Sequence, residues 1–216
     1  MVKDNQPKHR QRAKERRKLE RRKARRAELP TALVVCEGSC TEAYYLRGLA
    51  NHLRVNRANL VIEIAGTKTD PRQMVRQARN SFKVSPDFDY VFVVCDGDSP
   101  NFTKAVEDSK ARLRKADGNK VSIEVVATHP SFEFWLLLHF EYTTATMNTG
   151  GAIAHLKAHL PDYQKNDRNI FDKVSAGLDQ ACQNGVRCDE ELAKTGTHSP
   201  KSDMPLVVEA LKKLGR

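Results

Sequence analysis

Short apolar runs rich in β-branched residues alternate with helical segments from Thr31 onward, and this alternation limits the possible folds more than any other feature of the sequence. Strands are expected at residues 32–36, 60–65, 90–95 and 121–127. Helices are expected between and after them, at residues 41–53, 71–82, 101–116 and from 131 onward. Strands that alternate with helices in this way form right-handed βαβ units. The sequence therefore predicts an α/β fold in which helices flank a mostly parallel, four-stranded sheet.

Charge and periodicity divide the chain into three predicted parts. Residues 1–29 form a basic arm, residues 30–140 an α/β domain, and residues 141–216 a helical extension that packs on that domain. No apolar run approaches the roughly 18 residues that a membrane span requires, so no membrane partner is expected. The five cysteines form no regular framework, and Cys36 and Cys95 lie inside apolar strands. This cysteine usage favours a reducing cytoplasm.

The first 26 residues carry the positive charge of the chain. They contain 13 Lys and Arg against 3 Asp and Glu, a surplus equal to the formal net charge of +10. Because residues 11–27 include good helix formers but almost no apolar face, they are expected to be disordered or an isolated helix. Dense positive charge favours nucleic-acid binding through counterion release, with a merely solvated tail as the alternative. The expected contacts come from Arg16, Arg17, Arg21, Arg22, Arg25 and Arg26.

Two of the predicted strands end in carboxylates. Glu37 follows the first strand, and Asp96 and Asp98 follow the third. Because the carboxyl ends of parallel strands meet at one edge of a sheet, these side chains are expected to lie together. Carboxylates that close repel each other unless a cation lies between them, and Mg²⁺ or Mn²⁺ suits such oxygen ligands. The sequence therefore predicts a divalent-cation site, in which Glu37 is either a ligand or the general base.

Several segments of the chain resemble a known family. The acidic-glycine turn after the first strand and the strand end Asp96-Gly97-Asp98 are similar to the signature of Toprim domains, found in topoisomerases, primases and OLD-type nucleases. More closely, the chain resembles the RloB-like family, a Toprim-related group also described as AbiLii-like. The resemblance rests on residues 35–45, 96–98, 129–140 and 163–165. The family's Asn-Pro-Ser triplet stands here as His129-Pro130-Ser131.

This resemblance implies a Toprim-like fold and a metal-dependent nuclease in bacterial anti-phage or abortive-infection defence, often beside an ATPase partner protein. It also extends the candidate site by three residues. Glu42 is expected either to support a metal ligand or to complete a second metal site. Glu133 is expected to be a further carboxylate ligand, and Lys165 is expected to clamp a phosphate group.

Three functions are compatible with these patterns. The first is a Mg²⁺-dependent endonuclease of Toprim type that cleaves DNA or RNA. The second is a catalytically inactive Toprim-like module that binds nucleic acid mainly through the basic arm. The third is a Toprim enzyme with other phosphoryl-transfer chemistry. Because an unregulated nuclease would harm its own cell, restraint by a partner or by homo-oligomerisation is expected.

Overall fold

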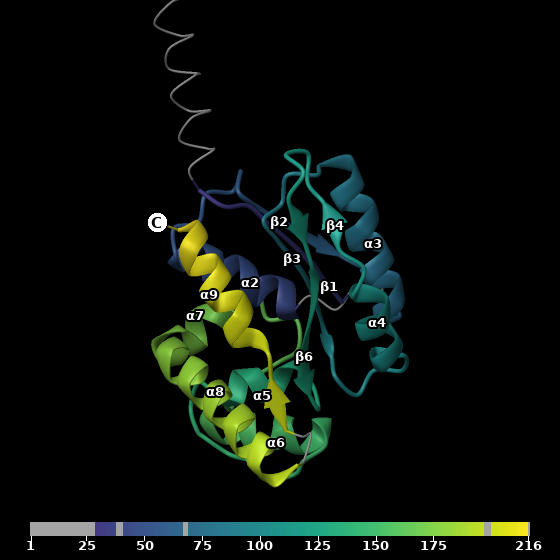
Figure 1. The fold of residues 1–216 in the computed structure, drawn as a ribbon. Coiled ribbons are helices and arrows are strands. Elements are labelled where there is room, and N and C mark those ends of the chain that lie inside the picture. Colours follow the sequence, from purple (N-terminus) through teal and green to yellow (C-terminus); the bar gives the residue numbers. More distant parts are fainter. Residues whose placement is uncertain (1–28, 38–40, 67–68, 197–199, 216) are drawn as a thin grey trace, which may run out of the picture.

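A sheet lies at the centre of the fold in the computed structural model, which describes residues 29–37, 41–66, 69–196 and 200–215 (Figure 1). Within these ranges the sheet has five strands in the order β2-β1-β3-β6-β7. The strands are β1 (Ala32–Cys36), β2 (Leu60–Ile64), β3 (Tyr90–Asp96), β6 (Ile123–His129) and β7 (Lys201–Ser202). The first four are parallel and β7 is antiparallel to β6. The prediction of a mostly parallel sheet flanked by helices is therefore confirmed.

Helices cover both faces of the sheet (Figure 1). Helices α2 (Thr41–His52) and α9 (Met204–Leu214) pack on one face, and α3 (Pro71–Val84) and α4 (Phe102–Ser109) on the other. The two faces are built from alternate residues of each strand, because successive side chains of a strand point in opposite directions. In β1, Val34 belongs to the core under α2, whereas Leu33 and Val35 belong to the core under α3.

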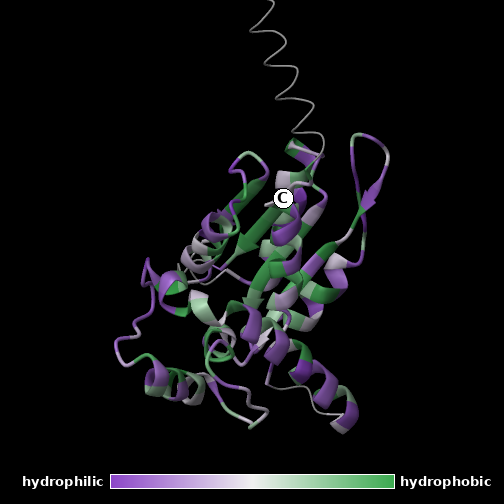
Figure 2. Ribbon diagram, turned by 90° about the vertical axis from the view of Figure 1, so that its left-hand side faces the viewer, coloured by the Kyte–Doolittle hydropathy of each residue, from purple (hydrophilic) through white to green (hydrophobic). Residues whose placement is uncertain are grey.

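This two-sided burial explains why β1 and most of β3 are apolar. All five residues of β1 have 0% exposure. Figure 2 shows the same arrangement, with hydrophobic strands enclosed between helices whose outer faces are hydrophilic. A strand that is buried on both faces reads as a continuous apolar run, which is the pattern that identified β1 and β3 in the sequence.

The segment after β6 is helical and shares a core with the sheet. It contains α5 (Phe132–Leu137), α6 (Thr149–His159), α7 (Ile170–Val174), a 3₁₀ turn (Ser175–Gly177) and α8 (Leu178–Thr195). Buried residues of these helices form one apolar cluster with the α2 face of the sheet. The chain then returns to the sheet through β7 and α9. Helix α5 thereby connects the edge of the sheet at β6 to the helical part of the molecule.

Two features differ from the sequence prediction. The helix expected at 101–116 ends at Ser109 and is followed by a hairpin of β4 (Leu113–Arg114) and β5 (Lys120–Val121). The hairpin turn places Gly118 at φ 89° and closes with a hydrogen bond from Lys115 N to Asn119 O. Turn-forming Asp, Gly and Asn at 117–119 therefore override the helical tendency of the preceding residues.

Strand β7 was not expected either. It is only two residues long, and the Asp203 side chain fixes it by accepting a hydrogen bond from Ala127 N at 3.1 Å. No sequence pattern with a period of two can mark so short a strand. No described helix is long and apolar enough to cross a membrane.

Candidate active site

The carboxyl ends of three neighbouring strands meet at one edge of the sheet. Glu37 directly follows β1, and Asp96 is the last residue of β3. In the parallel register, Cys36 lies beside Val94 and Asp96 beside Thr128 of β6. Helices α2 and α5 begin at this same edge and carry an acidic residue in their first turns.

The acidic residues at this edge are Glu37, Glu42, Asp96, Asp98 and Glu133, and we refer to them as the acidic cluster. They lie at the ends of β1 and β3 and at the starts of α2 and α5, and their charges interact. Asp96 feels the charges of Glu42, Glu133 and Glu37, and Glu37 in turn feels the charge of Asp98. The fold therefore brings all the carboxylates predicted from the sequence into one electrostatic neighbourhood.

Asp96 links the end of β3 to the start of α5. Its Oδ1 accepts a hydrogen bond from Phe132 N at 2.9 Å. Burial, followed by repulsion from Glu42, raises the pKa of Asp96 to about 7. The Phe132 amide opposes this shift, and Glu133 and Glu37 add to it. The ionised form of Asp96 is therefore costly at neutral pH in the absence of a compensating positive charge.

Glu42 is the most deeply placed carboxyl group that lacks a partner. Its side chain is 7% exposed, and Oε2 is buried without a hydrogen-bond partner among the described residues. Burial raises its pKa to about 7, with further repulsion from Glu133 and Glu37. Buried polar atoms are normally paired, so this oxygen is a candidate ligand for a bound cation.

Glu37 and Asp98 form the more accessible side of the cluster. Glu37 is half-buried and Asp98 is exposed. Burial and then the charge of Asp98 raise the pKa of Glu37, whereas Lys165 lowers it. These two carboxylates can therefore reach groups that approach from solvent.

Glu133 is held differently from the other four acids, because protein groups already satisfy both of its oxygens. Oε2 accepts a hydrogen bond from Ser131 Oγ at 2.7 Å, and Oε1 accepts one from Tyr163 OH at 3.0 Å. Lys165 Nζ lies 3.1 Å from the same Oε1. Burial alone would raise the pKa of Glu133, but Ser131 and Lys165 outweigh it and leave the pKa below its usual value.

Among the described residues, Lys165 is a cation that faces the acidic cluster. Its side chain remains about half exposed, although Nζ contacts Glu133. Burial opposes its charge, but Glu133 first, and then Asp96 and Glu42, raise its pKa. The next residue, Asn166, has φ 69° and donates its backbone N–H to Thr41 Oγ1 at 3.0 Å. This hydrogen bond fixes the Lys165 loop against the start of α2.

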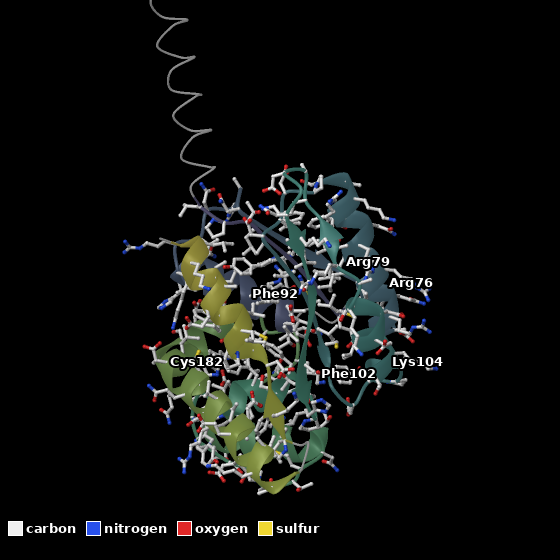
Figure 3. All side chains as sticks on the ribbon, viewed as in Figure 1. Arg76, Arg79, Phe92, Phe102, Lys104 and Cys182 are labelled. Carbon is white, nitrogen blue, oxygen red and sulfur yellow. The ribbon has the colours of Figure 1, made fainter. Side chains whose placement is uncertain are left out.

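A histidine lies against the turn between Asp96 and Asp98. A Cβ atom at Gly97 would stand 2.2 Å from His129 Nε2, so only glycine leaves room for this imidazole. The other side of the ring meets the edge of Phe102 from α4, with ring centroids 5.5 Å apart. Figure 3 shows Phe102 beside β6, from which His129 comes. His129 was quoted for the family resemblance but was not among the predicted site residues.

The chemistry of the donors fits a hard divalent cation. Carboxylate oxygens from Glu37, Glu42, Asp96 and Asp98 are the ligands that Mg²⁺ and Mn²⁺ prefer, and the unpaired Oε2 of Glu42 points to a missing positive group. In the described ranges, no three His, Cys, Asp or Glu side chains are already gathered around a common ligand position.

The structure thus brings Glu37, Glu42, Asp96, Asp98, Glu133 and Lys165 together. Arg16, Arg17, Arg21, Arg22, Arg25 and Arg26 lie outside the described residues. Sequence reasoning missed Ser131, Tyr163 and Thr41 as supports of the site. Ser131 stands two residues before Glu133, a spacing that could have identified it as a hydrogen-bond partner. Nothing in the sequence links Thr41 to Asn166 across 125 positions.

A second group of potential ligands lies away from this edge. His155 and His159 are one turn apart on α6, and the Glu141 carboxylate contacts both rings, at 3.3 Å and 3.0 Å. Their i, i+4 spacing is one that helical zinc ligands also use. The hydrogen bonds to Glu141 give the pair a structural explanation, since they fasten α6 to the segment that follows α5.

Comparisons with known proteins identify one family. Its sequence profile, described as RloB-like protein, matches residues 32–211, which include the acidic cluster and the helices after it as far as Leu211 in α9. Searches of curated proteins and of solved structures found no match.

Proposed function

The chain belongs to the RloB-like protein family, and from this premise we propose that it is a Mg²⁺-dependent nuclease that cleaves phosphodiester bonds in DNA or RNA. The acidic cluster carries the proposal. Its charge is opposed mainly by Lys165, and it contains a buried carboxylate oxygen without a partner. A protein gains no stability from such an arrangement, so we attribute it to a bound cation and a phosphate substrate.

Asp96 and Asp98 would hold the cation, with Glu42 behind them and Glu37 on the solvent side. When bound, Mg²⁺ supplies a Lewis acid that offsets negative charge on the oxygens of the reacting phosphate. Asp96 is already oriented by the amide of Phe132. The hydrogen bond leaves its second oxygen available to the site, as is usual for a metal ligand that the surrounding protein positions.

Lys165 is placed to bind a phosphate oxygen of the substrate. Its ammonium group lies between the buried Glu133 and solvent, and the Thr41–Asn166 hydrogen bond fixes its loop. Glu133 serves to position Lys165, because Ser131 and Tyr163 already occupy its oxygens. In this proposal Glu133 is therefore not a metal ligand, as the sequence had suggested, but holds the cation that meets the phosphate.

Glu37 is the group best placed to accept a proton from water. It is half-buried, and burial together with the charge of Asp98 raises its pKa. A raised pKa makes a carboxylate a better general base near neutral pH. Glu37 acts in this role on the solvent side of the cluster, while the more deeply placed Glu42 stays behind the ligands.

A cleavage assay tests the proposal. Mixed pools of DNA and RNA are incubated with the protein in Mg²⁺, in Mn²⁺ and in EDTA. We expect metal-dependent cleavage that is lost in Asp96→Asn and kept in Glu190→Gln, which alters an exposed carboxylate on α8. The absence of cleavage in every pool, or equal cleavage by Asp96→Asn, would refute the proposal. Retained nucleic-acid binding without cleavage by the wild type would instead identify an inactive binding module.

A role in anti-phage defence, with restraint by an ATPase partner protein or by self-association, is part of the same proposal. It is supported by the family to which the chain belongs. Expression of the chain alone should then be toxic to a bacterial host, and co-expression of the product of a neighbouring ATPase gene should relieve that toxicity. Toxicity that is unchanged by the partner would rule out this form of control.

A further inference from the structure

A second site lies between α2 and β2, on the outer strand of the sheet. It is a pocket of about 390 Å³, within the range of small-molecule sites, which is roughly 300 to 1,000 Å³. Its floor is apolar and is formed by Ala50, Val55, Leu60 and Ile62. Its polar lining comes from Arg47, Asn51 and Arg57, and no acidic residue contributes.

The polar groups of this pocket are not used by the fold. In the part of the chain that the structure describes, the side chains of Arg47, Asn51 and Arg57 make no hydrogen bond and no ion pair. All three are exposed. Arg72 of α3, by contrast, is held by Asp108 at 2.7 Å. Two free guanidinium groups beside an apolar floor attract an anion that also has an apolar face.

The outer side of β2 adds further hydrogen-bonding capacity. Strand β2 is the last strand of the sheet on this side, and no described strand pairs with its outer edge. Such an edge presents backbone N–H and C=O groups that are not used within the sheet. Leu60 and Ile62 belong both to this strand and to the pocket floor. A ligand on the floor therefore lies within reach of backbone donors and acceptors.

We propose that this pocket binds one nucleotide, with the base against the apolar floor and the phosphate between Arg47 and Arg57. A nucleobase combines a flat apolar face with edge groups that can bond to the strand, and the phosphate supplies the anion. The lack of acidic residues in the lining agrees with an anionic ligand.

The nucleotide is part of a nucleic-acid strand, and this statement rests on the proposed function. Leu29 and Pro30 lie beside the pocket, because Asn59 Nδ2 donates to Leu29 O at 3.1 Å and to Pro30 O at 3.2 Å. Asn59 directly precedes Leu60 of the floor. In the sequence, the 13 Lys and Arg of residues 1–26 come shortly before Leu29, and so many positive charges suit a polyphosphate better than an isolated nucleotide.

The test uses full-length protein in EDTA, so that binding is measured without cleavage. Fluorescence anisotropy follows a short labelled single-stranded oligonucleotide, and a parallel titration uses AMP. Arg47→Glu and Arg57→Glu reverse the two pocket charges, and Arg76→Glu is the matched control. Arg76 is an exposed helical arginine on α3, on the opposite face of the sheet, and points away from it (Figure 3). Circular dichroism checks that each variant is folded.

We expect Arg47→Glu and Arg57→Glu each to weaken oligonucleotide binding about tenfold or more, and Arg76→Glu to weaken it by less than about threefold. The double variant should also lower the salt dependence of binding by about 0.7 in logarithmic slope, the value for one lost phosphate contact on a single strand, because both guanidinium groups face the same phosphate. Tight binding of AMP, with the same loss in the pocket variants, would show a free-nucleotide site and overturn the strand assignment.

Equal losses in all three variants would show diffuse charge attraction and overturn the pocket. Wild-type affinity in both pocket variants would do the same, and so would displacement of the oligonucleotide by an acidic peptide at similar concentration. These outcomes are independent of catalysis. If the wild type cleaves nucleic acid and the pocket variants bind normally, the pocket alone fails. If the pocket variants bind weakly and no protein cleaves, the nuclease function alone fails.

Discussion

Glu42→Gln should stabilise the metal-free protein, and the gain should depend on pH. The carboxyl group is 7% exposed and has an oxygen without a partner among the described residues. Its pKa is raised from 4.5 to about 7. In the unfolded chain the group ionises near its usual pKa, so between these two values the folded protein holds the extra proton. The free energy of unfolding therefore falls as the pH rises through this interval and levels off above it.

The size of the effect follows from the shift. Each pKa unit corresponds to about 1.4 kcal/mol, so the ionised Glu42 costs the folded state about 3 kcal/mol at about pH 8. At about pH 5 the folded protein still holds the proton, and the cost falls to about 1 kcal/mol. Glutamine has the same shape and no charge. Glu42→Gln should therefore gain about 3 kcal/mol over the wild type at the higher pH and about 1 kcal/mol at the lower.

Urea denaturation in EDTA at the two pH values measures this difference. Glu190→Gln, which alters an exposed carboxylate on α8, serves as the control and should follow the wild type. Added Mg²⁺ should raise the stability of the wild type most at the higher pH, because a bound cation offsets the ionised carboxylates. The reasoning is wrong if Glu42→Gln and the wild type change in parallel with pH, or if Glu42→Gln is the less stable protein at the higher pH.

Three further changes test other parts of the structure. Tyr163→Phe removes a buried hydrogen bond to Glu133. It should lower the free energy of unfolding, measured by urea denaturation, by about 1 kcal/mol, and it should lower the rate of cleavage more than the affinity for substrate. Gly48→Ala places a Cβ 2.4 Å from Phe171 Cβ. This overpacking should lower the free energy of unfolding by about 1 to 3 kcal/mol, which thermal unfolding measures. An unchanged melting temperature would contradict the packing of α2 against Phe171. Deletion of residues 1–26 should weaken nucleic-acid binding and flatten its salt dependence in anisotropy titrations, while cleavage at high protein concentration persists.

Strands with strong periodic patterns could be predicted almost to the residue. Strands β1 and β3 lie in continuous apolar runs because both of their faces are buried, and their ends in Glu37 and Asp96 marked the edge where acidic residues gather. A parallel sheet fixes which strand ends meet, so the acidic cluster followed from topology. The position of this edge could be predicted without side-chain detail. The parallel register of β1 and β3 alone places Cys36 beside Val94, so the residues that follow both strands lie at the same edge.

The supports of the site could not be predicted in the same way. The hydrogen bonds of Glu133 to Tyr163 and of Thr41 to Asn166 join residues that are 30 and 125 positions apart. Only the packing of the helical segment against α2 brings these partners together. The same holds for the imidazole of His129, which occupies the space that a side chain at Gly97 would fill. Local patterns indicate which residues are acidic or apolar, but these contacts depend on the tertiary arrangement of the helices.

The pocket between α2 and β2 could not be predicted from the sequence either. Arg47 and Arg57 stand in a stretch of ordinary helical and loop composition, where exposed arginines are common. Their relation to an apolar floor appears only when α2 is packed beside the outer strand.

Binding of Mn²⁺ tests most directly whether the acidic cluster holds a divalent cation. Electron paramagnetic resonance of free Mn²⁺, measured during titration of metal-free protein, gives the number of ions bound and their affinity without any assay of cleavage. We expect saturable binding by the wild type and by Glu190→Gln, and its loss in Asp96→Asn. Equal binding by Asp96→Asn, or no saturable binding by the wild type, would contradict a metal site at the carboxyl ends of β1 and β3.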